Sequence, residues 1–125
     1  MKIYSDGGCH NNGTTDASMY GSFACVEGQQ IVHSEHFELD GQATNNVAEY
    51  LSLLRALEYA QKQGWESVEF CTDSQLVVGQ VTQGWKVNLP HLRSLVSQAK
   101  QILSGHPGWS LKQVPRTEVV SILGH

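Results

Sequence analysis

The fold is decided by residues 46–75, NVAEYLSLLRALEYAQKQGWESVEFCTDSQ. Apolar residues recur at helical spacing from position 46 to position 63, and Gly64 is a natural helix stop. Residues 67–72 have the composition of a short strand, and Asp73-Ser74-Gln75 supplies an N-cap for a second helix to about residue 83. A strand that follows a helical crossover favours parallel pairing with an earlier strand.

The segments on either side complete a mixed sheet. Residues 2–5 form a predicted strand that stops at Gly7-Gly8, and residues 10–18 are a polar loop. Residues 20–26 and 30–39 are predicted as an antiparallel hairpin around Gly28. A third helix is expected from near Pro90 to about residue 103, and a last strand over residues 109–114. The sum is an α/β fold with a mixed five-stranded sheet, comprising a three-stranded antiparallel meander and two later strands, and three helices.

Length and charge limit the function. The 125 residues, 40% of them hydrophobic and 16% charged, fit one domain over residues 1–125. Eight Lys and Arg against twelve Asp and Glu give a net charge of -4. This balance excludes a protein whose whole surface attracts polyanions, so any nucleic-acid contact has to be local or bridged by cations.

Composition also bears on the compartment. The three cysteines Cys9, Cys25 and Cys71 are odd in number and lack CxxC spacing, which predicts free thiols in a reducing compartment. The first residues turn polar too soon for a signal peptide, and no apolar run approaches the roughly 20 residues that span a bilayer. We therefore expect a cytoplasmic protein with no membrane partner, and no obligate protein partner is evident.

Three acids stand where solubility explains them poorly. Asp6 ends the first predicted strand, Glu49 lies near the start of the long helix, and Asp73 ends the fourth strand. If the first and fourth strands are neighbours, the two aspartates project from adjacent positions, and the helix can bring Glu49 to the same place. Three converging carboxylates repel one another in a partly desolvated site, and a divalent cation removes that conflict.

The type of ligand atom indicates which metal would bind. Carboxylate oxygens with no interleaved His or Cys select Mg²⁺ or Mn²⁺ over zinc. Two such ions about 3.5–4 Å apart can activate a water and stabilise a leaving oxygen in phosphoryl transfer.

Each acid also has a purely structural interpretation. Asp6 before two glycines suits a turn, Asn46 with Glu49 fits a capping box, and Asp73 suits a helix N-cap. Their order along one small α/β domain favours the functional interpretation.

At these residues the sequence resembles a known family, the type 1 ribonucleases H. The resemblance rests on Ser5-Asp6-Gly7-Gly8-Cys9 with Asn12, on Thr44-Asn45-Asn46-Val47-Ala48-Glu49, and on Thr72-Asp73-Ser74-Gln75. It covers nearly the whole chain in the same element order.

The resemblance implies a metal-dependent endonuclease that cuts the RNA strand of an RNA/DNA hybrid and leaves 5′-phosphate and 3′-hydroxyl ends. Asp6, Glu49 and Asp73 fall on three of the family's metal-binding acids. The residues expected to contact the hybrid are Asn12, Asn45, Asn46, Gln75 and Cys9. Side-chain amides can donate to and accept from the ribose 2′-hydroxyl, the group that distinguishes RNA from DNA.

The chain departs from the family after its last strand. The family has a fourth acid, an Asp in a helix preceded by a loop that bears a His, and here no Asp follows Asp73. Gly124-His125 resembles the Gly-His of that loop, so we expect the helix with the fourth Asp to be absent. The fourth acid is replaced by Glu118, by the terminal carboxylate of His125, by a partner chain or by nothing. The His125 side chain either assists catalysis or is disordered.

The binding surface departs as well. Some members insert a basic lobe before the third helix, whereas here residues 85–90 pass directly into it. A small DNA-facing patch could be formed by Trp85 together with Lys86, His91 and Arg93. The alternative for Trp85 is that its indole packs in the core. The sequence predicts a ribonuclease H of reduced activity or, as the alternative, a hybrid-binding module of the same fold that cuts weakly or not at all.

Overall fold

A computed structural model describes residues 1–11, 16–41 and 44–124 of the chain. Its elements, in order, are β1 (Lys2–His10), β2 (Ser18–Glu27), β3 (Gln30–Leu39), α1 (Asn45–Gln63), β4 (Val68–Thr72), α2 (Gln75–Thr82), α3 (Pro90–Ser104), β5 (Trp109–Gln113) and α4 (Arg116–Leu123).

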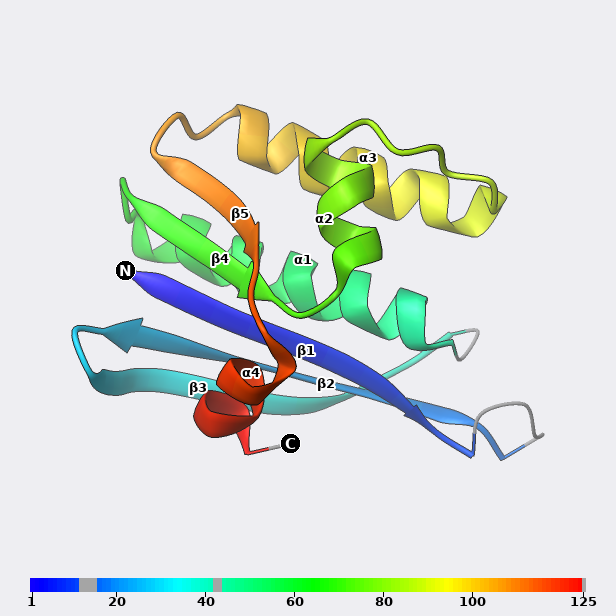
Figure 1. Ribbon diagram of the computed structural model, residues 1–125, viewed down its shortest axis with the longest axis horizontal. Helices are drawn as coiled ribbons and strands as arrows, with labels where there is room; N and C mark the ends of the chain where they lie inside the picture. Colours follow the sequence, from blue (N-terminus) through cyan, green and yellow to red (C-terminus); the bar gives the residue numbers. More distant parts are fainter. Residues whose placement is uncertain (12–15, 42–43, 125) are drawn as a thin grey trace.

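The five strands form one mixed sheet in the order β3-β2-β1-β4-β5 (Figure 1). The first three strands are an antiparallel meander, and β4 pairs in parallel with both β1 and β5. The predicted α/β fold with its mixed five-stranded sheet is confirmed, including the parallel pairing of the strand that follows the long helix.

Helices cover both faces of this sheet, and each face has its own apolar cluster. Ile3 and Phe70 point toward α1, α2 and α3, where they join the larger cluster. Tyr4 and Cys71, one residue further along each strand, point to the other face and pack with Val119 of α4. Figure 1 shows α4 alone on that second side of the described sheet.

The long helix α1 begins and ends as its sequence dictates. The Thr44 side chain accepts a hydrogen bond from the Val47 backbone N–H, which caps the first turn. Gly64 ends the helix in a left-handed conformation (φ 70°) that a residue without a side chain adopts at little cost. Between them one face packs on the sheet, which fixes where Glu49 can reach.

The first strand is longer than predicted. Gly7-Gly8 does not stop it, because β1 stays paired with β2 as far as His10 opposite Ser18. Asp6 therefore lies within β1 and does not end it. Paired glycines favour a strand end, but Gly7 instead allows α1 to approach β1 closely. A Cβ on Gly7 would lie 2.3 Å from the Ala48 carbonyl group.

The expectation of three helices is also wrong, because a fourth follows β5. Residues 116–123 form α4, and Val119 and Leu123 are buried against the second face of the sheet. This segment contains no Asp, so a helix is present where none was expected but it does not restore the missing acid.

Two further observations bear on the sequence analysis. Cys9, Cys25 and Cys71 are free cysteines, as predicted. Among the described residues no helix combines the length and apolar character needed to cross a bilayer.

Candidate active site

The register of β1 and β4 brings two aspartates together. The parallel ladder pairs Lys2 with Glu69 and ends with Tyr4 opposite Cys71. Continued by two residues, the same offset sets Asp6 opposite Asp73, on the face of the sheet that Tyr4 and Cys71 share. The two carboxylates thus lie just beyond the last residue pair of the β1–β4 ladder.

Glu49 reaches this point from α1, on the opposite face of the sheet. Its Oε1 accepts a hydrogen bond from the Gly7 backbone N–H at 2.5 Å, and its Oε2 lies 3.5 Å from the Thr72 hydroxyl. Both partners adjoin the aspartates in sequence. The close contact of α1 with Gly7 is therefore what allows a helix carboxylate to join two strand carboxylates.

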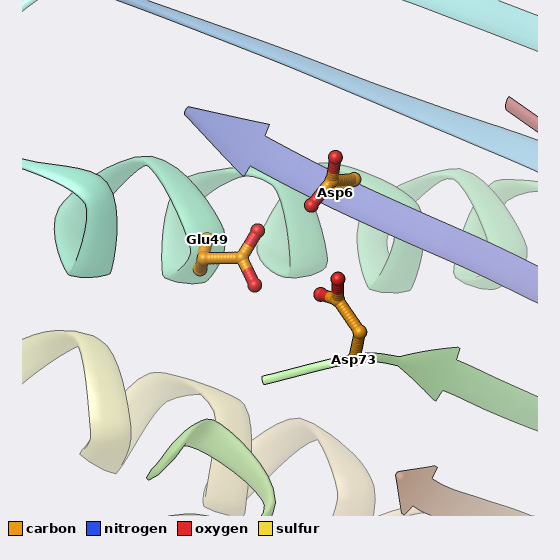
Figure 2. A group of neighbouring side chains, drawn as sticks. All are labelled: Asp6, Glu49 and Asp73. Carbon is orange, nitrogen blue, oxygen red and sulfur yellow. The ribbon is translucent and has the colours of Figure 1, made fainter. Parts of the chain in front are cut away.

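The three acids form one group. Asp6, Glu49 and Asp73 each offer a carboxylate oxygen, and these oxygens lie within 4.8 Å of one another. Figure 2 shows the three side chains pointing toward a common point from β1, α1 and the end of β4. Asp6 is buried, with 3% of the residue exposed, so its charge is poorly solvated.

The electrostatics of the group are unfavourable for three negative charges. Burial, followed by the hydrogen bond and the charge of Asp6 and by the charge of Asp73, raises the pKa of Glu49 to about 9, although the Gly7 N–H acts in the opposite direction. The charged form of Glu49 needs a cation close by.

One cation is supplied by the chain itself. The Nη1 of Arg116, the first residue of α4, lies 2.8 Å from Asp73 Oδ2 and 3.3 Å from Asp6 Oδ2. Hydrogen bonding to Asp73 and the charge of Asp6 raise the pKa of Arg116. Sequence reasoning missed this residue, because a lone arginine after a strand carries no signal that it will bridge two distant acids.

The candidates for a fourth ligand do not join the group. The Glu118 carboxylate accepts a hydrogen bond from the Tyr4 hydroxyl at 2.6 Å and does not belong to the three-acid cluster. Glu118 as a substitute for the fourth Asp is thus not supported. His125 and its terminal carboxylate lie outside the described residues.

The capping interpretations of the acids are wrong. The cap of α1 is Thr44, not Asn46, and the cap of α2 is Ser74, whose hydroxyl accepts from the Val77 N–H at 3.2 Å. Glu49 and Asp73 are therefore not occupied as caps.

Four of the five residues expected to contact substrate lie in described elements. Asn45 is exposed and Asn46 half-buried in the first turn of α1, and Gln75 is exposed at the start of α2. Cys9 is half-buried in β1. Asn12 lies outside the described residues. Their roles stay predictions.

Trp85 is packed on one side and exposed to solvent on the other. Its ring packs on α2, since a Cβ built on Gly79 would lie 2.2 Å from it, and yet 40% of the residue is exposed. A half-exposed aromatic face of this kind is available for stacking.

The donor set fits a hard divalent cation. It consists of three carboxylates without His or Cys, the ligand chemistry of Mg²⁺ and Mn²⁺. The guanidinium between two of the acids also shows that a positive charge is accommodated there.

Comparison with known proteins agrees with this geometry. The family model described as "Reverse transcriptase-like" matches residues 5–121. Ribonuclease HI of Halobacterium salinarum is 38% identical over 116 residues, which are 93% of this chain and 57% of that protein. The chain thus spans a little over half the length of this relative.

Solved structures lead to the same family. Ribonuclease H1 of Halobacterium salinarum matches with a TM-score of 0.86 and 35% identity, over 98% of this chain and 91% of that one. LC11 ribonuclease H1, isolated from compost, matches in its complex with an RNA/DNA hybrid with a TM-score of 0.83 and 28% identity, over 98% and 91%. With the family model spanning nearly the whole chain and these structures matched almost end to end, the chain belongs to the reverse transcriptase-like family, alongside the type 1 ribonucleases H.

Proposed function

We propose that this protein is a ribonuclease H, an endonuclease that hydrolyses the RNA strand of an RNA/DNA hybrid. The observation that carries the proposal is the convergence of Asp6, Glu49 and Asp73, from three separate elements, within 4.8 Å. The similar LC11 ribonuclease H1 was solved with an RNA/DNA hybrid, which supports the choice of substrate.

The reaction is a phosphodiester hydrolysis. A water oxygen attacks the scissile phosphorus and the bond to the 3′ oxygen breaks, which leaves a 5′-phosphate and a 3′-hydroxyl. Two Mg²⁺ or Mn²⁺ ions bound at the three carboxylates would supply the charge that activates the water and stabilises the leaving oxygen. Asp6, Glu49 and Asp73 would hold these ions, and Arg116, which contacts Asp6 and Asp73, would have to release both for the ions to bind.

Substrate recognition is assigned to five polar side chains. We propose that Asn12, Asn45, Asn46, Gln75 and Cys9 contact the hybrid, with the amides bonding ribose 2′-hydroxyls. Because the net charge is -4, these local contacts and the bound ions have to provide the attraction.

Three secondary assignments complete the proposal. One domain over residues 1–125 carries the activity, the protein acts in the cytoplasm, and His125 assists catalysis.

A second candidate, a hybrid-binding module that cuts weakly or not at all, is favoured by one observation. Glu118 is engaged by Tyr4, so the fourth acid of the family has no replacement among the described residues. Loss of one outer ligand weakens one metal position, which predicts reduced activity or a preference for Mn²⁺.

One assay separates the two candidates. A labelled hybrid is incubated with Mg²⁺ or Mn²⁺ and either the wild type or Asp73→Asn, which keeps the side-chain shape but removes a ligand charge. If the protein is the proposed enzyme, the wild type cleaves the hybrid and the cleavage rate of the variant is at least about a hundredfold lower. Equal binding with no cleavage by either protein would support the module.

A further inference from the structure

A buried polar side chain links the helix of Glu49 to the loop of Trp85. Gln80 lies in α2 with only 4% of the residue exposed, among apolar neighbours. Burying an amide is costly unless it is hydrogen-bonded, and here the amide oxygen and the amide nitrogen each have a partner. Its Oε1 accepts from the Tyr50 hydroxyl at 2.7 Å, and its Nε2 donates to the Lys86 carbonyl at 3.3 Å.

The two partners come from different parts of the chain. Tyr50 is fully buried in α1 and directly follows Glu49 in the chain. Lys86 directly follows Trp85 in the irregular segment between α2 and α3. The glutamine therefore connects the helix that carries a site carboxylate with the segment that exposes an aromatic ring and a lysine.

This segment is fixed although it has no regular structure. The Trp85 N–H donates to the Gly79 carbonyl at 3.1 Å, and the Arg93 side chain donates to the Val87 carbonyl at 3.2 Å. With the Gln80 bond, three consecutive residues are each tied to a helix. The bond to Lys86 is the one of these three that leads back to α1.

We propose that Gln80 is a positioning residue, which sets the Trp85-Lys86 segment relative to Glu49 so that the segment and the acids bind one hybrid together. The inference rests on the proposed function. It adds that Trp85 and Lys86 contact the nucleic acid through the indole face and the ammonium group, in a position held by Gln80 and Tyr50.

The test compares four variants by hybrid cleavage under steady-state conditions. Gln80→Met keeps the size but removes both hydrogen bonds, and Trp85→Ala removes the ring. We expect each to raise KM about fivefold to tenfold with kcat within about twofold of wild type. The double variant should show little more than the larger single effect, because both changes remove the same contact. Val77→Ala, in the same helix, is the control for lost packing and should leave KM unchanged.

A second measurement does not need catalysis. Amide hydrogen exchange at residues 85–87 should be faster in Gln80→Met than in wild type or Val77→Ala, and binding of a hybrid with 2′-O-methyl RNA should weaken in parallel with KM. The inference would be overturned if Gln80→Met had the same KM and the same exchange rates as the wild type. It would also be overturned if Val77→Ala raised KM as much as Gln80→Met does. A wild type that neither binds nor cuts hybrid would instead contradict the proposed function, and unchanged exchange in Gln80→Met would still overturn the positioning role.

Discussion

Glu49 has a strongly perturbed carboxyl group. Burial and the two aspartates raise its pKa to about 9 from an ordinary value of 4.5. Because the pKa is raised on folding, protonated Glu49 favours the folded state. This contribution is complete below the unfolded pKa and is lost as the pH rises through the folded pKa.

A pH series on metal-free protein tests this point. We expect the free energy of unfolding to fall between about pH 4.5 and pH 9, and Glu49→Gln, which can still accept from Gly7, to flatten that fall. Denaturant melts in the presence of a chelator measure it. A variant with the same pH profile as wild type would show that Glu49 is not the group responsible.

Arg116 occupies the place where the proposed metal ions would bind. Arg116→Met removes the guanidinium from Asp6 and Asp73, so we expect the metal-free protein to lose about 1 kcal/mol of stability, a modest figure because the arginine is largely exposed. Mn²⁺ should bind about fivefold tighter, since no internal cation has to be displaced. Isothermal titration measures the affinity, and weaker Mn²⁺ binding in the variant would mean that Arg116 supports the metal.

Individual residues were predictable only where their position along the chain determines their place in space. The three acids follow from the order of the strands and the long helix. Arg116 and Gln80 do not, because each acts through partners far apart in sequence. An arginine on a short helix and a glutamine in an apolar helix resemble ordinary surface and core residues until their partners are known.

At the scale of elements, the contact of α1 with β1 forms the site. Gly7→Ala would place a methyl group 2.3 Å from the Ala48 carbonyl group, which forces the helix away from the strand. We expect a loss of about 1–3 kcal/mol of stability and a loss of metal binding, because Glu49 moves with α1. Thermal melts with and without Mn²⁺ measure both effects.

Gly105→Ala is the matched control for this substitution. A methyl group there would lie 3.5 Å from its nearest neighbour, an ordinary contact, and the backbone is right-handed (φ −80°). Its Mn²⁺-induced rise in melting temperature should equal that of the wild type. Gly7→Ala with the same metal response as Gly105→Ala would contradict the role of this contact.

The elements were predicted where periodicity was long and missed where it was short. Residues 46–63 carry enough apolar repeats to identify α1. In α4, the buried pair Val119 and Leu123 has helical spacing, but eight residues offer a single repeat, and the Gly-His that follows was interpreted as part of a loop. Gly7-Gly8 favours a strand end in the sequence, because neither the exact register of β1 with β2 nor the close approach of α1 to Gly7 can be read from it.

At the scale of the whole molecule, net charge limits how the proposed hybrid substrate would be held. With eight Lys and Arg in total, few cations are available to meet phosphates. We expect the logarithm of the binding constant to fall with the logarithm of salt concentration with a slope of about −2, measured by fluorescence anisotropy at constant Mg²⁺. A slope several times steeper would indicate a phosphate-binding surface that this account lacks.

The architecture of the molecule was the most predictable level. A meander followed by a helical crossover allows few arrangements, and the parallel β1–β4 pair follows from the usual handedness and pairing of such crossovers. That pair determines where Asp6 and Asp73 meet, so the site follows from the topology.

The most direct test is a crystal structure of the protein soaked in Mn²⁺, with the ions located by anomalous scattering. We predict anomalous density between the carboxylates of Asp6, Glu49 and Asp73, with the Arg116 guanidinium displaced. Manganese bound elsewhere, or Arg116 still bridging both aspartates at saturating Mn²⁺, would contradict it.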